Sequence, residues 1–161
     1  LVVSNLYKKD KYLFIKIKKK FPDKVSNFPL KKEEVLKIIL QKQKNLNILG
    51  KIIHPIVRKT MQNFLKKNKK KKFVVLDIPL FLENRLNEKK DIIIFVEADK
   101  KKINQKLKKR KNINPKLINI LRRNQFRIKL KKKKSTYVIR NNFVRKTAMK
   151  NIKLIMKEIN K

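Results

Sequence analysis

The sequence has no cysteine, one glycine and one histidine among 161 residues. Without cysteine, disulfide bonds, a thiolate nucleophile and a cysteine-based metal site are all excluded. The lone histidine cannot form a zinc site without further ligands. No apolar run approaches the roughly 20 residues that a membrane-spanning helix needs, and no signal-peptide pattern opens the chain. These absences favour a soluble, cytoplasmic protein of one domain.

Acidic residues are also scarce: 11 Asp and Glu stand against 49 Lys and Arg, a formal net charge of +38. Such a charge is typical of nucleic-acid binders. Only eight of the basic residues are arginine, however, and the lysines are spread over every segment. Together with the depletion of glycine and alanine, this indicates codon bias in an A/T-rich genome. We predict weak, salt-sensitive attraction to polyanions and no specific nucleic-acid partner. A lysine-driven nucleic-acid-binding module remains the alternative.

Hydrophobic periodicity predicts helices before the first strand and a strand–helix alternation after it. The first block is helical, with a predicted interruption at His54-Pro55. Continuous apolar runs then predict buried strands, and Asp99 and Asn114-Pro115 are typical of helix starts. Alternating strands and helices predict an α/β fold with a parallel sheet. The expected helices cover residues 1–21, 30–40, 45–65, 99–110, 114–126 and 144–159, and the expected strands 73–77, 91–96 and 137–139.

The most informative segment is Asp77–Glu83, which reads DIPLFLE and directly follows the apolar run Phe73–Leu76. Ligands in open α/β folds bind beyond the carboxyl ends of the strands. Asp77 and Glu83 would therefore lie where the chemistry of such folds takes place. The alternative is a strand followed by an ordinary turn, with Glu83 as a surface acid.

Five segments, in order along the chain, resemble the dephospho-coenzyme A kinase family: IIHPIV at 52–57, LDIPLFLEN at 76–84, LKKR at 107–110, LRRNQ at 121–125 and STYVIRNN at 135–142. The resemblance covers nearly the whole chain. It implies a three-layer parallel sheet like that of P-loop NTPases, incomplete here, in a single domain over 1–161. Within it we expect a helical acceptor-binding insertion at 22–68, core sheet at 73–105, a helical lid at 106–134, and a core strand with the C-terminal helix at 135–161.

The sequence also departs from the family pattern. The family begins with a strand, a phosphate-binding loop G-x-x-x-x-G-K-S/T and then D-A/S-D, and neither motif is present. Gly50 has no partner glycine and lies in a helical pattern, so it cannot form that loop. The segment Leu1–Ser4 resembles the stretch that follows D-A/S-D. We therefore expect a chain truncated just past its catalytic acid, with unknown catalytic residues upstream of Leu1 and negligible turnover of its own. Arg140 also replaces the usual Asp of the last strand.

The resemblance implies transfer of the γ-phosphoryl group of ATP to the ribose 3′-hydroxyl of dephospho-coenzyme A, the final step of coenzyme A synthesis, with ATP and Mg²⁺. Leu80, Phe81 and Glu83 would line the acceptor pocket, and His54 could touch the substrate from a mainly structural position. Asp77 could reach Mg²⁺ through water, with no direct metal ligand in the chain. Leu80 could equally belong to the core. A non-catalytic paralogue that binds coenzyme A-like ligands is the second alternative.

The resemblance also implies a nucleotide-binding role for arginines of the lid. Arg110 would close on the nucleotide, because a guanidinium group can stack on adenine and pair with phosphate. Its alternative is a cation that stabilises a helix C-terminus. Arg127 lies four residues after Arg123 and five after Arg122, so the three would share much of one helix face and either hold phosphates or face solvent. The oligomeric state has no signal in the sequence.

Overall fold

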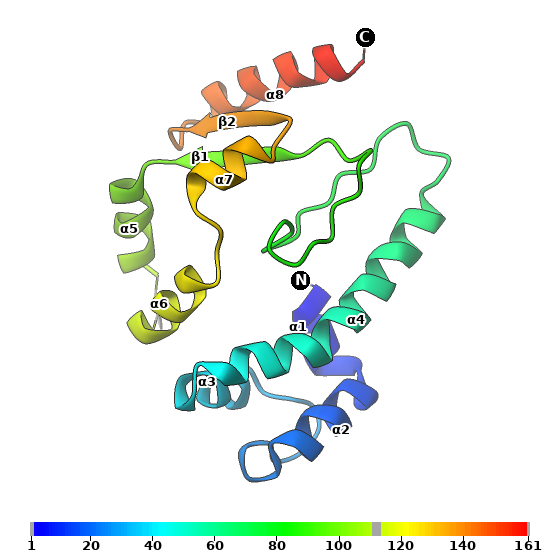
Figure 1. Ribbon diagram of the computed structural model, residues 1–161, viewed down its shortest axis with the longest axis vertical. Coiled ribbons are helices and arrows are strands. Elements are labelled where there is room, and N and C mark those ends of the chain that lie inside the picture. Colours follow the sequence, from blue (N-terminus) through cyan, green and yellow to red (C-terminus); the bar gives the residue numbers. More distant parts are fainter. Residues whose placement is uncertain (1, 111–113, 161) are drawn as a thin grey trace. The chain divides into compact units, whose positions relative to one another are not determined.

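The structure is a computed structural model that describes residues 2–110 and 114–160. Its backbone divides into two compact units, Leu1–Ile78 and Pro79–Lys161. The chain has a mixed α/β composition, with helices in both units and a small parallel sheet in the second (Figure 1). In the part of the chain that is described, no helix is both long and apolar enough to cross a membrane.

The first unit is helical. It contains helices α1 (Val2–Lys9), α2 (Lys11–Lys20), α3 (Lys32–Gln41) and α4 (Lys44–Lys67), with a short 3₁₀ turn at Pro22–Lys24 (Figure 1). Asp10 separates the first two helices, because its carboxylate accepts a hydrogen bond from the Leu13 N–H at 2.8 Å and caps α2. The helical pattern predicted for residues 1–21 is confirmed, as two helices.

The helices of the first unit enclose a core of their own. Leu13 and Ile17 of α2 and Ile38 of α3 are fully buried, and Leu49 of α4 is 2% exposed. Asn45 is buried too, and its side-chain amide donates to the Ile38 carbonyl at 2.8 Å, so this polar group costs little. The other core residues of the unit are Val25, Leu30, Val35, Ile39 and Ile53.

Helix α4 is continuous through Pro55. The predicted interruption at His54-Pro55 is wrong. A proline inside a helix removes one backbone hydrogen bond, at a cost of about 3 kcal/mol. Leu49 and Ile53 before the proline are buried, and Val57 after it, half-buried, continues the same four-residue spacing. Packing along this face outweighs the local cost.

The second unit carries the sheet. It contains β1 (Ile94–Ala98), α5 (Lys100–Lys108), α6 (Pro115–Arg123), α7 (Ile128–Lys133), β2 (Tyr137–Asn141) and α8 (Arg145–Ile159). The two strands pair in parallel, with Ile94 opposite Tyr137, and α8 packs on β2 (Figure 1). The predicted parallel pairing is confirmed.

Side-chain caps begin two helices of the second unit as predicted. Asp99 accepts from the Lys102 N–H at 2.9 Å at the start of α5. Asn114 accepts from the Leu117 N–H at 3.2 Å, and Pro115 stands at the first position of α6. Both helices therefore begin where local side-chain chemistry directs them.

The strand predicted at 73–77 is wrong. Residues 73–78 have no regular secondary structure and belong to no sheet, and the sheet in the described residues has two strands, β1 and β2. A strand gains its stability from hydrogen bonds and side-chain contacts with a neighbour, and Val75 is 87% exposed. The three-layer sheet stays a prediction, as do the ranges of the insertion and lid; residues 111–113 of the lid lie outside those described.

Candidate functional site

Residues 79–85 form a series of tight turns at the start of the second unit, which we call the 79–85 turn. Its backbone is closed by hydrogen bonds from the Asn84 N–H to the Leu80 carbonyl at 3.0 Å and from the Leu86 N–H to the Phe81 carbonyl at 3.2 Å. Leu80 and Arg85 have φ of 56° and 50°, in the left-handed region that side chains other than Gly, Asn and Asp rarely occupy. The motif DIPLFLE therefore ends in a strained, closely folded turn.

Glu83 links this turn to residues more than 40 positions further along the chain. Its side chain is 9% exposed, and its Oε1 accepts a hydrogen bond from the Phe126 N–H at 2.9 Å and an ion pair from Lys131 Nζ at 3.0 Å. Lys131 lies in α7, and its side chain is 16% exposed. We call this three-residue arrangement the Glu83 bridge. Glu83 is thus a partly buried, paired carboxylate rather than an ordinary surface acid.

The electrostatics of Glu83 follow from these contacts. Burial on its own would raise the pKa of the Glu83 carboxyl. The hydrogen bonds from the Phe126 N–H and from Lys131, with the positive charge of Lys131, outweigh burial and hold that pKa below its ordinary value. The carboxylate is therefore charged at neutral pH and able to accept hydrogen bonds.

Two other predicted acceptor residues lie in the same turn. Leu80 and Phe81 are both half-buried, so each has an apolar surface to offer a ligand and a part packed against the protein. Asp77 belongs to the first unit, is exposed and lies in the segment without regular secondary structure before the turn.

His54 is half-buried in α4 of the first unit, with its ring against the backbone of Gly50. A Cβ atom at position 50 would lie 3.1 Å from His54 Cε1, so any other residue there would require the imidazole ring to shift by a few tenths of an ångström. Burial, and then the positive charge of Arg58, lower the pKa of His54. The imidazole is therefore neutral at physiological pH.

The predicted lid arginines are not on one helix face, and that prediction is wrong. Helix α6 ends at Arg123 with Asn124 as its C-cap, and Arg127 is the residue that precedes α7. Asn124 donates to the Ile120 carbonyl at 2.8 Å, which ends the helix before Arg127. Arg122 donates to Asn104 of α5 at 2.5 Å.

Arg110, Arg122, Arg123 and Arg127 are all exposed. Arg110 lies just past the C-terminus of α5, and its N–H donates to the Leu107 carbonyl at 3.0 Å. This position suits both predicted roles, because a cation there stabilises the helix end and remains accessible to an anionic ligand.

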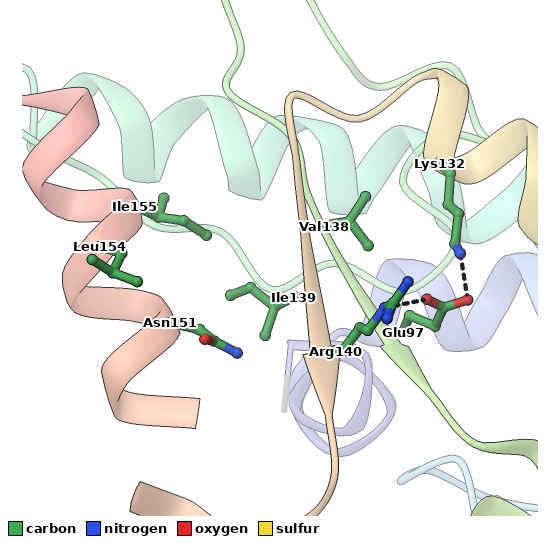
Figure 2. A pocket seen from close by; sticks show the side chains of 8 residues that line it. All are labelled: Glu97, Lys132, Val138, Ile139, Arg140, Asn151, Leu154 and Ile155. Carbon is green, nitrogen blue, oxygen red and sulfur yellow. Dashed lines mark ion pairs between the residues drawn. The ribbon is translucent and has the colours of Figure 1, made fainter. Parts of the chain in front are cut away.

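Arg140 stands opposite Glu97 in the parallel pair, with its Nε 3.9 Å from the Glu97 carboxylate, and Lys132 pairs with the same carboxylate at 2.7 Å. Figure 2 shows Glu97 between these two cations, at a hollow that Val138, Ile139, Asn151, Leu154 and Ile155 also line. An Asp at position 140 would place two acids opposite each other, which is unfavourable. Arg140 therefore fits its neighbour across the sheet.

The fit of a magnesium ion depends on oxygen ligands. The described residues contain no group of three or more His, Cys, Asp and Glu that could hold a metal ion. Mg²⁺ in phosphate-transfer sites is held mainly by substrate phosphates and water, with one or two carboxylates. A single exposed carboxylate such as Asp77 is compatible with a water-mediated contact and does not form a metal site on its own.

The sequence alone does not identify the two groups that contact Glu83, Lys131 and the Phe126 N–H. Lys131 is one of four consecutive lysines, so composition does not distinguish it from its neighbours. The Phe126 N–H is a backbone group, and its use depends only on where α6 ends. A rule that buried acids need a cation would have indicated that some lysine pairs with Glu83, but not which one.

The fold and this site define a mixed α/β protein with a parallel sheet and a turn whose one carboxylate, that of Glu83, pairs with a lysine of a basic helix. The family model of dephospho-CoA kinase matches residues 1–146, and the chain belongs to this family. The dephospho-CoA kinase of Wolbachia pipientis wMel is 31% identical over 161 residues, which cover 99% of this chain and 82% of that protein.

Two further relatives have the same description. That of the Wolbachia of Brugia malayi is 28% identical over 96% of this chain and 80% of its own length. That of Bartonella quintana is 30% identical over 85% of this chain and 71% of its own length. The resemblance drawn from the five sequence segments is therefore confirmed at the level of the family.

Proposed function

We propose that this protein acts in the ATP-dependent phosphorylation of the ribose 3′-hydroxyl of dephospho-coenzyme A, the final step of coenzyme A synthesis, in the cytoplasm. The observation that carries the proposal is the Glu83 bridge, in a chain of the dephospho-CoA kinase family. It joins the motif expected to hold the acceptor to a basic segment expected to cover it.

Phosphoryl transfer needs alignment of donor and acceptor and positive charge around the phosphates, and little covalent help from the protein. The 79–85 turn supplies alignment in this proposal. Leu80 and Phe81 give apolar contact to the acceptor, and the ionised Glu83 accepts a hydrogen bond from one of its hydroxyl groups. In the first unit, His54, whose pKa is lowered by burial and by Arg58, is proposed separately as a residue that contacts substrate.

The exposed arginines supply charge. Arg110, Arg122, Arg123 and Arg127 would contact the phosphates or the adenine of ATP, and a guanidinium group can do both. When bound, Mg²⁺ would offset the charge of the ATP phosphates, with Asp77 in contact through a water molecule. The sequence contains one glycine and no phosphate-binding loop. We propose that these 161 residues provide the acceptor cradle and the lid.

The experiment is a calorimetric titration of the chain with dephospho-coenzyme A at about 150 mM salt, near physiological ionic strength. We expect one saturable site that an excess of short duplex DNA does not displace. A duplex that binds tightly, with no binding of dephospho-coenzyme A, would instead indicate a nucleic-acid-binding module. Coenzyme A formed from ATP and the ligand, measured by mass spectrometry, separates turnover from binding alone.

A further inference from the structure

Helix α7 has little local support. It is six residues long, and Arg127, its N-cap residue, makes no side-chain capping hydrogen bond. Isolated helices of this length are unstable in water, so tertiary contacts must hold it. The Glu83 bridge supplies such contacts on both sides of its start: Oε1 accepts from the Phe126 N–H, before the helix, and from Lys131 within it. One carboxylate thus orients the whole segment 126–131.

The lysines of the run 131–134 have different surroundings. Lys131 pairs with Glu83 and is 16% exposed, whereas Lys132 pairs with Glu97 and is 39% exposed. Lys133 is exposed on the same helix. An ion pair that is largely shielded from water is screened less by salt than a surface pair. Among the ion pairs described for this run, that of Lys131 reaches the 79–85 turn, whereas that of Lys132 reaches Glu97 of β1.

We propose that Lys131 is a positioning residue that acts through Glu83. It holds the carboxylate, and with it the 79–85 turn, in the geometry that receives the acceptor. This inference rests on the proposed function, since it assigns the turn to acceptor binding. It adds that binding depends on a lysine outside the motif, and that the turn and α7 respond to the ligand as one element.

The test compares Lys131→Met with Lys133→Met. Both variants remove one positive charge from α7 and keep an unbranched side chain, so the general attraction of the protein for an anionic ligand falls equally. We expect Lys131→Met to weaken dephospho-coenzyme A binding about tenfold, the loss of about 1.4 kcal/mol that one charge-assisted hydrogen bond can supply. Lys133→Met should change the affinity by about twofold or less.

Lys131→Arg is the conservative variant, and it should keep most of the affinity because a guanidinium group can also pair with Glu83. Its circular dichroism spectrum and that of Lys131→Met confirm that the helices are formed. If Lys131→Arg keeps the affinity for dephospho-coenzyme A and Lys131→Met loses it, the positive charge at position 131 is what binding requires. Equal affinities of the two Met variants would overturn the assignment of Lys131.

The two proposals fail differently. If the unmodified chain binds no dephospho-coenzyme A, the proposed function falls, and the role of Lys131 falls with it. If the unmodified chain binds and Lys131→Met binds equally well, only the role of Lys131 falls. A double-mutant cycle between Glu83→Gln and Lys131→Met, measured by ligand affinity, should give clearly non-additive losses; additive losses would show that Lys131 does not act through Glu83.

Discussion

Nine of the buried hydrophobic residues in the described chain lie in the first unit, and two, Ile139 and Ile155, lie in the second. The first unit thus has a core built from α2, α3, α4 and the segment that joins α2 to α3, and its apolar side chains are packed away from water. The second unit has a sheet of two strands, on which Val96 and Val138 are 54% and 42% exposed. Helices that pack against one another bury their apolar faces even in a small unit. A sheet of only two strands leaves many of its apolar side chains exposed to solvent.

Order in the second unit therefore depends more on polar contacts between distant residues. Glu83 pairs with Lys131, Glu97 with Lys132, and Arg122 with Asn104. The Glu83 pair responds to pH because the pKa of its carboxyl is lowered, and the more exposed Glu97–Lys132 pair responds to salt. Most of the residues expected to bind the acceptor and ATP lie in this unit. These candidate binding residues therefore belong to the unit with the smaller buried core. The following variants test that difference, from the largest expected effect to the smallest.

Ile38→Ala should cause the largest loss of stability. Ile38 is fully buried, and truncation leaves a cavity that costs about 2–5 kcal/mol. Ile155→Ala removes the same atoms from the second unit, where fewer buried neighbours surround the site, and should cost less. Urea unfolding followed by circular dichroism measures both. Equal losses would contradict the contrast between the units, and Ile15→Ala, 60% exposed, is the surface control.

Glu83→Gln should cost about 1–3 kcal/mol, because it weakens hydrogen bonds to a charged acceptor and leaves the largely buried Lys131 without its counter-charge. The control is Glu88→Gln, whose partner Lys90 is 83% exposed and whose pair should contribute little. The bridge should also be sensitive to acid. The folded pKa of Glu83 is lowered, so its contribution is complete above the ordinary value of 4.5 and disappears as the pH falls through the folded pKa.

Unfolding of the Glu83→Gln variant and of the unmodified chain should therefore be compared across that acid range. The stability difference should shrink as the pH falls below 4.5. A difference that stays constant at all pH values would show that the charge of Glu83 does not stabilise the fold.

Arg85→Gly should increase stability by up to about 1 kcal/mol. Arg85 has φ of 50°, a conformation that costs an ordinary side chain about 1–2 kcal/mol, and part of the gain is lost to the greater freedom of glycine in the unfolded chain. Thermal unfolding should show a midpoint higher by a few degrees, about 2–4 °C. Arg123→Gly, at the end of α6, is the matched control and should not stabilise.

Protonation of His54 should have the smallest effect on stability. Its pKa is lowered by burial and by Arg58, so it should titrate below its ordinary value of 6.5. The unfolded chain then binds the proton more readily, and stability falls slightly as the pH drops from 6.5 through the lower folded pKa. As the only histidine, it can be followed by NMR without assignment. A midpoint above 6.5 would contradict the burial of the ring against Gly50.

The local features of the fold could be predicted from sequence because they depend on neighbouring residues. Asp99 and Asn114 mark helix starts through their own side-chain hydrogen bonds, and the apolar runs of β1 and β2 indicate strands that pair in parallel. The failures concern tertiary contacts. The run 73–77 has the composition of a strand but no neighbour in the sheet, and α4 passes Pro55 because packing on both sides of it outweighs a local cost.

The candidate site could also be predicted only in part, because its motif is local in the sequence and its partners are tertiary contacts. The DIPLFLE motif indicated that Glu83 is more than a surface acid, and the structure shows its carboxylate largely buried and paired with a cation. Lys131 could not be selected among four identical neighbours, because the choice depends on the end of α6 and the direction of α7. The role of the turn as acceptor site remains a proposal, supported by the family and by the Glu83 bridge.

Hydrogen exchange, measured by mass spectrometry with and without dephospho-coenzyme A, tests the central claim most directly. The amide groups of 79–86 and of 126–131 report on the two sides of the Glu83 bridge. We predict that both segments gain protection together when the ligand is added, while the lysine-rich segment 66–72 does not change. Protection confined to lysine-rich segments, or absent from 79–86, would contradict the claim that this turn receives the acceptor.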